Sequence, residues 1–180
     1  MDDVSGEMGI SKKTLYTHFK DKEELIKKVI DSEFEKNIGA FEELKKSTMN
    51  AIEHLLKVNT IVNKQISEYS PSLEYDLKKY YPGIYQKLSE RKNGYMQEAI
   101  RQNLEQGKKE GIYRETLDVE VITKLYVTRI NNIHEEDLFP AEEFVSPHVF
   151  LECFEYHIRG ISNEKGIKIF ENYLKTKSTE

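Results

Sequence analysis

The sequence predicts an all-helical protein. Apolar residues recur three and four positions apart in nearly every segment between helix breakers, whereas strict alternation of apolar and polar residues is hard to find. Only nine glycines and four prolines interrupt the 180 residues. Charged residues make up 33% of the chain, above the roughly 25% of an average globular protein. Few breakers and many charges are typical of long helices with a solvated face.

The N-terminal segment predicts two short helices separated by a tight turn. Acidic residues at positions 2 and 3 suit the start of the first helix, and Gly9 suits its end. Ser11 is a candidate N-cap for the second helix, over residues 12–19. The inward face of that second helix is expected to hold Leu15 and Phe19.

A long connecting helix is predicted next. Asp21 and Glu24 are spaced as in a capping box, the reciprocal pairing that begins many helices. Apolar residues then keep one stripe from Leu25 to Leu44, a length of about six helical turns. We expect a first domain at residues 1–46, ending with this helix, and a second domain at residues 47–180.

The rest of the chain predicts further helices. Two prolines, at positions 71 and 82, separate neighbouring helical patterns, because the residue before proline disfavours helix. Asp118 is a candidate cap, and Ser146 with Pro147 opens another helix. The helical patterns lie at 52–66, 73–79, 84 to 107 or 111, 118–133, 146–158 and 167–174.

Composition excludes several classes of protein. The single cysteine, Cys153, rules out an internal disulfide and a cysteine-based zinc site. No window approaches the roughly 20 apolar residues of a membrane span, and the first residues lack a signal-peptide pattern, so we expect a cytoplasmic protein without a membrane partner. No nucleophile motif, glycine-rich phosphate loop or pair of histidines at metal-ligand spacing is present. We therefore expect no enzyme activity, no metal and no cofactor.

A local basic region interrupts an otherwise acidic chain. The formal net charge is -5, yet the segment from Gly9 to Lys28 contains six lysines and only three acidic residues. With Leu15 and Phe19 turned inward, lysine, tyrosine and threonine side chains cover the outward face of the second short helix. Lysines neutralise phosphates, and hydroxyl groups donate to phosphate oxygens or base edges. The segment therefore predicts a DNA site of the helix-turn-helix kind.

Residues 9–25, GISKKTLYTHFKDKEEL, closely resemble the DNA-binding signature of the tetracycline-repressor (TetR) family of bacterial transcription regulators. The resemblance covers about 25 residues directly, and the rest of the chain is similar to the family in helix lengths and order. It implies a TetR-like fold with a helix-turn-helix head and a larger helical body. It also implies that Leu15 and Phe19 only pack. The residues then expected to contact DNA are Ser11, Lys12, Lys13, Thr14, Tyr16, Thr17, His18 and Lys22.

The resemblance further implies a small-molecule effector bound in the body. A tyrosine-rich stretch is the candidate lining, and the alternative is that these hydroxyls merely reach polar partners at the surface. The candidate pocket residues are Tyr69, Tyr80, Tyr81, Tyr85 and Tyr95.

Two helices of the body, those opened by Asp118 and Pro147, carry apolar faces wider than a surface helix needs. Packed against a second copy, they would form a four-helix bundle in a homodimer, as members of the resembling family do. The alternative is that they bury the core of their own chain. The candidate interface residues are Leu125, Ile130, Phe150, Phe154 and Ile158.

The sequence departs from the family pattern at one point. Family members carry a further helix ahead of the one predicted near Asp2, so we expect Val4, Leu15 and Phe19 to lose part of their cover. Two interpretations stay open: Met1 is an internal methionine, or the head is partly disordered. Accordingly the sequence predicts a ligand-responsive repressor that binds a palindromic operator as a dimer. The alternative is a helical ligand-sensing or protein-interaction module that no longer binds DNA.

Overall fold

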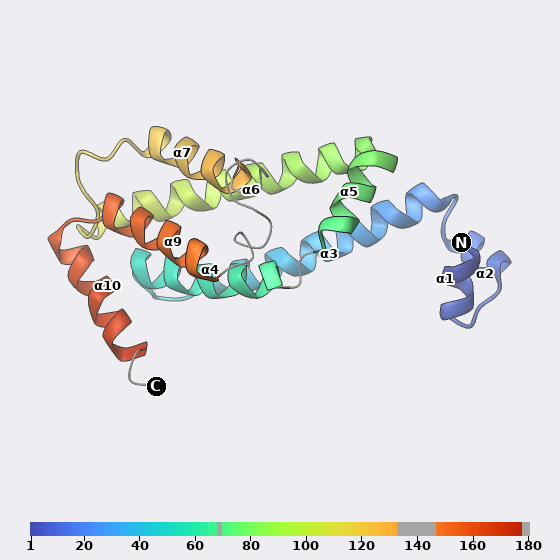
Figure 1. Ribbon diagram of the computed structural model, residues 1–180, viewed down its shortest axis with the longest axis horizontal. Coiled ribbons are helices and arrows are strands. Elements are labelled where there is room, and N and C mark those ends of the chain that lie inside the picture. The colour runs from blue at the N-terminus through green and yellow to red at the C-terminus, as the bar shows by residue number, and fades with distance from the viewer. Residues whose placement is uncertain (68–69, 133–146, 178–180) are drawn as a thin grey trace. The chain divides into compact units, whose positions relative to one another are not determined.

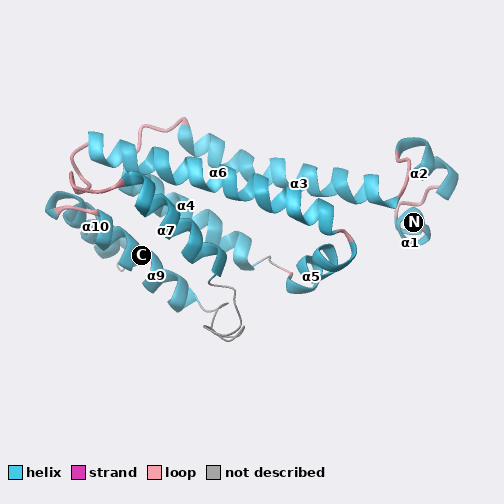
Figure 2. Ribbon diagram, turned by 90° about the horizontal axis from the view of Figure 1, so that it is seen from above, coloured by secondary structure: helices cyan, strands magenta, loops and turns pink. Residues whose placement is uncertain are grey.

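The computed structural model describes residues 1–67, 70–132 and 147–177. Within these ranges the chain forms helices joined by short connections, and its one β-type pairing is an isolated bridge between Tyr113 and Ser162 (Figures 1 and 2). The predicted all-helical class is confirmed. The elements are α1 Asp2–Glu7, α2 Lys12–His18, α3 Lys22–Lys45, α4 Ala51–Ser67, α5 Pro71–Tyr80, α6 Pro82–Lys109, α7 Val119–Asn132, α9 Pro147–Ile161 and α10 Glu164–Lys177. Among the described helices, none is long and apolar enough to cross a membrane.

The chain divides into two compact units. The first comprises Met1–Phe41 and Ser70–Glu90, and the second comprises Glu42–Tyr69 and Arg91–Glu180. Helices α3 and α6 each begin in the first unit and end in the second. The grouping of α5 with the N-terminal helices was not foreseen from the sequence, and the domain boundary after residue 46 stays a prediction.

Side chains cap the helices where the sequence predicts caps. At the start of α2 the Ser11 Oγ accepts the Thr14 N–H at 3.0 Å, and ahead of α3 the Asp21 Oδ1 accepts the Glu24 N–H at 2.8 Å. Glu24 returns the bond by accepting the Lys20 N–H at 2.7 Å. These bonds satisfy backbone donors that have no partner within their own helix. Three caps are therefore confirmed, since Asp118 also accepts the Val121 N–H, at 3.0 Å, ahead of α7.

The cover of the apolar side chains in α1 and α2 differs from the expectation. Leu15 is only 1% exposed, so its expected loss of cover is wrong. Phe19 is half-buried, whereas Val4 and Met8 are 37% and 60% exposed. Helices α1 and α2 therefore pack around Leu15, and Val4 and Met8 contribute little to that packing.

The second unit is organised around Tyr113, which is fully buried. Its ring lies directly against Gly107 of α6, at a place where any Cβ would collide with it. Its hydroxyl donates to the Asn103 Oδ1 at 2.9 Å, and Asn103 in turn donates to the Ala51 carbonyl at 2.8 Å. Because Ala51 begins α4, this buried chain of hydrogen bonds fixes the end of α6 against the start of α4.

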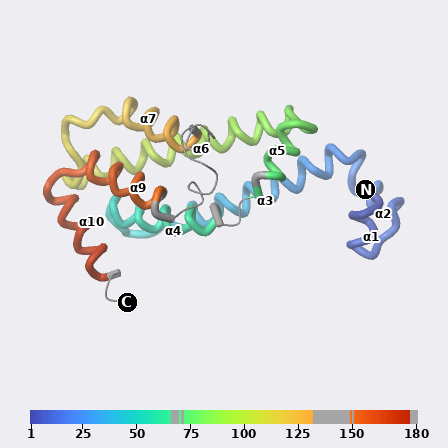
Figure 3. The backbone as a smooth tube through the Cα atoms, viewed as in Figure 1, coloured from blue at the N-terminus to red at the C-terminus, as the bar shows by residue number. Residues whose placement is uncertain are grey.

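The reversal after α6 depends on Gly111, whose φ of 67° lies in the left-handed region that glycine adopts without strain. The Ile112 N–H donates to the Gly107 carbonyl at 3.0 Å, and the Gly111 N–H donates to the Lys108 carbonyl at 3.0 Å. These are the two bonds of a Schellman motif. The chain then runs back as α7, in the direction opposite to α6 (Figure 3).

Close packing at Gly107 predicts a large difference between two substitutions in the same helix. Gly107→Ala should lower the free energy of unfolding by about 1–3 kcal/mol, because the methyl group overlaps the Tyr113 ring. Gly94→Ala has open space and should raise it by about 0.5–1 kcal/mol through better helix propensity. Urea unfolding of both variants checks this, and equal effects would contradict the packing described.

The cap at Ser11 predicts a local loss of stability. Ser11→Ala should weaken α2 by about 1 kcal/mol, because the Thr14 N–H loses its acceptor. Native-state hydrogen exchange of the α2 amides measures this local change. Ser32→Ala, an exposed serine within α3, is the control and should stay within about 0.5 kcal/mol of the parent. Unchanged exchange in Ser11→Ala would show that the cap carries no stability.

Candidate nucleic-acid interface

The corner between α1 and α2 is a left-handed glycine turn. Gly9 has a φ of 64°, and its N–H donates to the Gly6 carbonyl at 3.1 Å. The Ile10 N–H reaches back to the Ser5 carbonyl, also at 3.1 Å. This Schellman motif ends α1 and leads directly into the cap of α2. Gly9 thus has the helix-ending role that the sequence predicts for it.

Burial of Leu15 sets which face of α2 is turned outward. Because Leu15 lies inward, its neighbours one and two positions away along the helix are directed away from the packing. Tyr16 is 45% exposed. All of the residues expected to contact DNA are exposed on α2, its cap or the first turn of α3: Ser11, Lys12, Lys13, Thr14, Tyr16, Thr17, His18 and Lys22. The structure thus brings them together at the surface, and their contact with DNA stays a prediction.

Several of these polar groups already have intramolecular partners. The Ser11 and Thr14 hydroxyls lie 2.8 Å apart, and the Thr17 hydroxyl donates to the Thr14 carbonyl at 2.6 Å. Lys13 and Lys22 form no ion pair with any residue in the described ranges. These two ammonium groups are therefore the clearest candidates for phosphate contacts in this part of the chain.

An ion pair that sequence reasoning missed links α1 to α2. The Lys12 Nζ lies 2.9 Å from the Asp2 Oδ1, and hydrogen bonding and charge from Lys12 hold the pKa of Asp2 below its ordinary value. Both side chains are well exposed. The acidic residue ten positions before Lys12 was the available signal, but it was interpreted only as a helix-start preference. Lys12 is thus shared between this pair and any phosphate.

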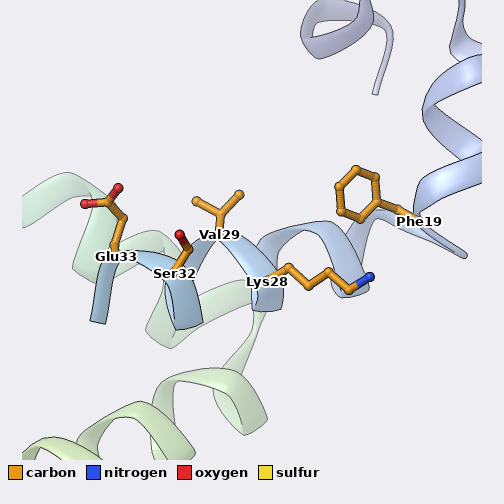
Figure 4. A pocket seen from close by; sticks show the side chains of 5 residues that line it. All are labelled: Phe19, Lys28, Val29, Ser32 and Glu33. Carbon is orange, nitrogen blue, oxygen red and sulfur yellow. The ribbon is translucent and has the colours of Figure 1, made fainter. Parts of the chain in front are cut away.

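Basic and apolar side chains also meet where α2 leads into α3. The Lys28 Nζ lies 5.2 Å from the centre of the Phe19 ring and 3.1 Å from the Glu24 carboxylate. The pKa of Glu24 is lowered mainly by the hydrogen bond from the Lys20 N–H and to a smaller extent by Lys28. Figure 4 shows the Lys28 side chain extending toward Phe19 in a shallow pocket that Val29, Ser32 and Glu33 complete. Phe19 therefore packs, as expected, with a lysine over its face.

The tyrosines predicted to line a ligand pocket lie in different surroundings. Tyr85 donates to Glu74 at 2.9 Å in the first unit, and Tyr95 donates to Glu42 at 2.8 Å in the second. Tyr80 is 61% exposed and has Lys79 over its ring, and Tyr81 is half-buried. Tyr69 lies outside the described residues. Tyr85 and Tyr95 thus donate to carboxylates, in agreement with the alternative that the tyrosine hydroxyls reach polar partners at the surface. The ligand pocket stays a prediction.

Helices α7 and α9 divide their apolar residues between the core and the surface. Phe154 and Ile158 are 6% and 0% exposed and pack within the core of their own chain, as the alternative to a dimer interface expects. Ile130 is half-buried, and the Phe150 side chain lies outside the described set. Leu125 is 60% exposed and stays a candidate for contact with a second copy.

Clusters able to hold a metal ion were sought among His, Cys, Asp and Glu. In the portions of the chain that the structure describes, no three such side chains are placed so that they could hold a metal ion. A surface depression at the start of α10 is lined by Asn163, Glu164, Lys165 and Lys168, which belong to one helix end and include no convergent acids or nucleophiles. Among the described residues, the outward face of α2 is thus the strongest candidate for a functional site.

Comparison with known proteins supports the resemblance of α1 and α2 to the TetR family. Residues 1–29 match the model of a family described as "Bacterial regulatory proteins, tetR family". No curated protein matches the chain. The structure is similar to that of the ketosteroid transcriptional regulator KstR2 of Mycobacterium tuberculosis, with a TM-score of 0.56 and 20% identity over 90% of this chain and 84% of that one.

A TetR-family transcriptional regulator from Streptomyces coelicolor is also similar in structure, with a TM-score of 0.64 and 18% identity over 90% of this chain and 84% of that one. Identities this low concern the fold, and both folds are those of transcription regulators. The family match over residues 1–29 includes all of α1 and α2, and the chain has a TetR-like all-helical fold.

Proposed function

We propose that this protein is a ligand-responsive repressor of transcription that binds a palindromic DNA operator as a homodimer. The observation that carries the proposal is the outward face of α2, where hydroxyl and lysine side chains stand exposed beside the Gly9 turn. A short helix of this kind enters the major groove with its N-terminal residues toward base edges. The rest of the basic region supplies charge for the phosphates on either side.

The residues of the face divide between two kinds of contact. Lys13 and Lys22, which have no acidic partner in the described chain, suit phosphate oxygens. Tyr16 and Thr17 are exposed on α2 and suit contacts that depend on the operator. Phosphate contacts give affinity for every duplex, whereas base contacts give preference for one sequence.

Exposed apolar side chains on α7 and α9 support the homodimer. Val121 and Leu125 of α7 are 50% and 60% exposed, and Leu151 and Tyr156 of α9 are 51% and 79% exposed. Large exposed apolar side chains on neighbouring helices are characteristic of association surfaces. A two-fold dimer presents two recognition helices to half-sites about 34 Å apart, one turn of DNA, and the operator is then palindromic.

The ligand response follows from a shift between conformers. An effector that binds better to the form with mis-spaced recognition helices lowers operator affinity by its differential affinity for that form. About 3 kcal/mol of coupling is enough for a hundredfold release. In the proposed repressor, this shift between conformers is how the ligand releases the operator.

Replacing Lys22 tests the phosphate contacts. Lys22→Ala should weaken binding to the duplex upstream of the protein's own gene and to a scrambled duplex alike, and should reduce the salt slope by about one unit. Fluorescence anisotropy across a salt series measures both quantities. Lys36→Ala removes an exposed lysine about four turns further along α3 and should leave both quantities unchanged. Equal effects of the two substitutions would contradict the role of Lys22.

Replacing Tyr16 or Thr17 tests sequence-dependent contacts. Each alanine variant should lose about 1–3 kcal/mol of binding to the upstream duplex and much less to the scrambled duplex. The ratio of the two affinities, measured by anisotropy at fixed salt, is the readout. If both variants keep the parent ratio, the outward face of α2 does not read the operator.

A further inference from the structure

A group of polar side chains links α7 and α9 in the second unit. Arg129 of α7 is half-buried, and its guanidinium carbon lies 4.6 Å from the centre of the Tyr126 ring. One arm of the guanidinium, the Nη1, donates to the Cys153 carbonyl of α9 at 2.6 Å. His157 of α9 lies against the same tyrosine, with ring centres 4.0 Å apart and the ring planes tilted by 45°. Two helices thus hold one cation and two aromatic rings in a fixed arrangement.

This cation has no counter-charge in the described chain. A guanidinium carries five N–H donors, and the hydrogen-bond partners of Arg129, the Cys153 carbonyl and the Tyr126 hydroxyl, are both neutral. The contrast is with Arg159 of α9, which is paired with Glu155 at 2.7 Å and Glu171 at 3.3 Å. Half-burying an arginine without an anion carries a desolvation penalty that an ion pair would offset.

The two rings beside Arg129 do not supply negative charge. Burial, with the charge of Arg129 adding to it, lowers the pKa of His157 to about 3, so the imidazole is neutral near pH 7. A neutral imidazole offers one donor and one acceptor. Burial also raises the pKa of Tyr126, so its phenol keeps its proton. The surroundings of Arg129 therefore favour binding of an external anion over internal neutralisation.

A buried hydroxyl without a partner lies on the same face of α7. Thr123 is 5% exposed, and its Oγ1 makes no hydrogen bond in the described structure. It precedes Tyr126 by three positions, so the two residues are neighbours along the helix. A buried polar group without a partner is rare in native proteins and calls for an explanation. A bound polar molecule would provide one.

We propose that Arg129, flanked by Tyr126 and His157, is the recognition point for an organic carboxylate bound between α7 and α9. The planar guanidinium pairs with a carboxylate through two parallel hydrogen bonds, and stacking on the tyrosine holds it in orientation for that. Tyr126 packs against the apolar core of the second unit, which suits an apolar remainder of the ligand. This proposal names the effector class of the ligand response proposed above and rests on it.

The test uses two carboxylates and their neutral analogues. Benzoate and octanoate, at constant ionic strength, should raise the melting temperature of the full 180-residue chain, whereas benzamide and octanamide should not. The variant R129Q should weaken carboxylate binding about tenfold or more, since a charge-assisted pair is lost. R129K, which keeps the charge without the fork, should fall between R129Q and the parent.

R159Q is the matched control, because it removes an arginine whose charge is already paired, and it should keep the full response. Circular dichroism of each variant without ligand checks that it folds. No carboxylate-dependent shift in the parent chain, or equal losses in R129Q and R159Q, would overturn the proposal. Because the assay contains no DNA, a carboxylate response in a chain that fails to bind its upstream duplex would support this site while overturning the repressor proposal.

Discussion

The second unit depends on one close contact, the Tyr113 ring against the bare backbone of Gly107. Without a side chain at position 107, the ring reaches its place in the core, and its hydroxyl reaches Asn103. Asn103 then holds the first carbonyl of α4, and the Gly111 turn sends the chain back as α7. Close packing of this kind tolerates little added volume, so the glycine is a structural requirement. Helices α4, α6, α7 and α9 contribute to the core that contains Tyr113.

The N-terminal helices rely on local hydrogen bonds more than on burial. Their main apolar anchor is Leu15, while the Gly9 turn, the Ser11 cap and the Asp21 and Glu24 pair fix where each helix begins and ends. Short-range bonds of this type orient α2 with few buried side chains. The exposed lysines and hydroxyls then follow from helix periodicity alone, since the residues beside an inward leucine must be directed outward.

This difference explains how much was predictable from the sequence. Caps and glycine turns are encoded within three or four residues, so Ser11, Asp21, Asp118 and Gly9 were identified correctly, and with them the helical class. Contacts between distant residues leave no such local signal. Tyr113 against Gly107, the Lys12 and Asp2 pair, and the Arg129 contact with α9 each join separate elements. On the wide apolar faces of α7 and α9, Phe154 and Ile158 lie in the core of their own chain, whereas Leu125 is 60% exposed, and the sequence alone did not separate the two cases.

Sequence-selective DNA binding is the central claim, and one measurement tests it most directly. The full chain is titrated by fluorescence anisotropy against the duplex upstream of its own gene and against a scrambled duplex, at low and physiological salt. The account predicts a preference for the upstream duplex that survives physiological salt, because base contacts are less screened than phosphate attraction. Equal binding to both duplexes that disappears as salt rises would contradict it, since only phosphate attraction would then remain.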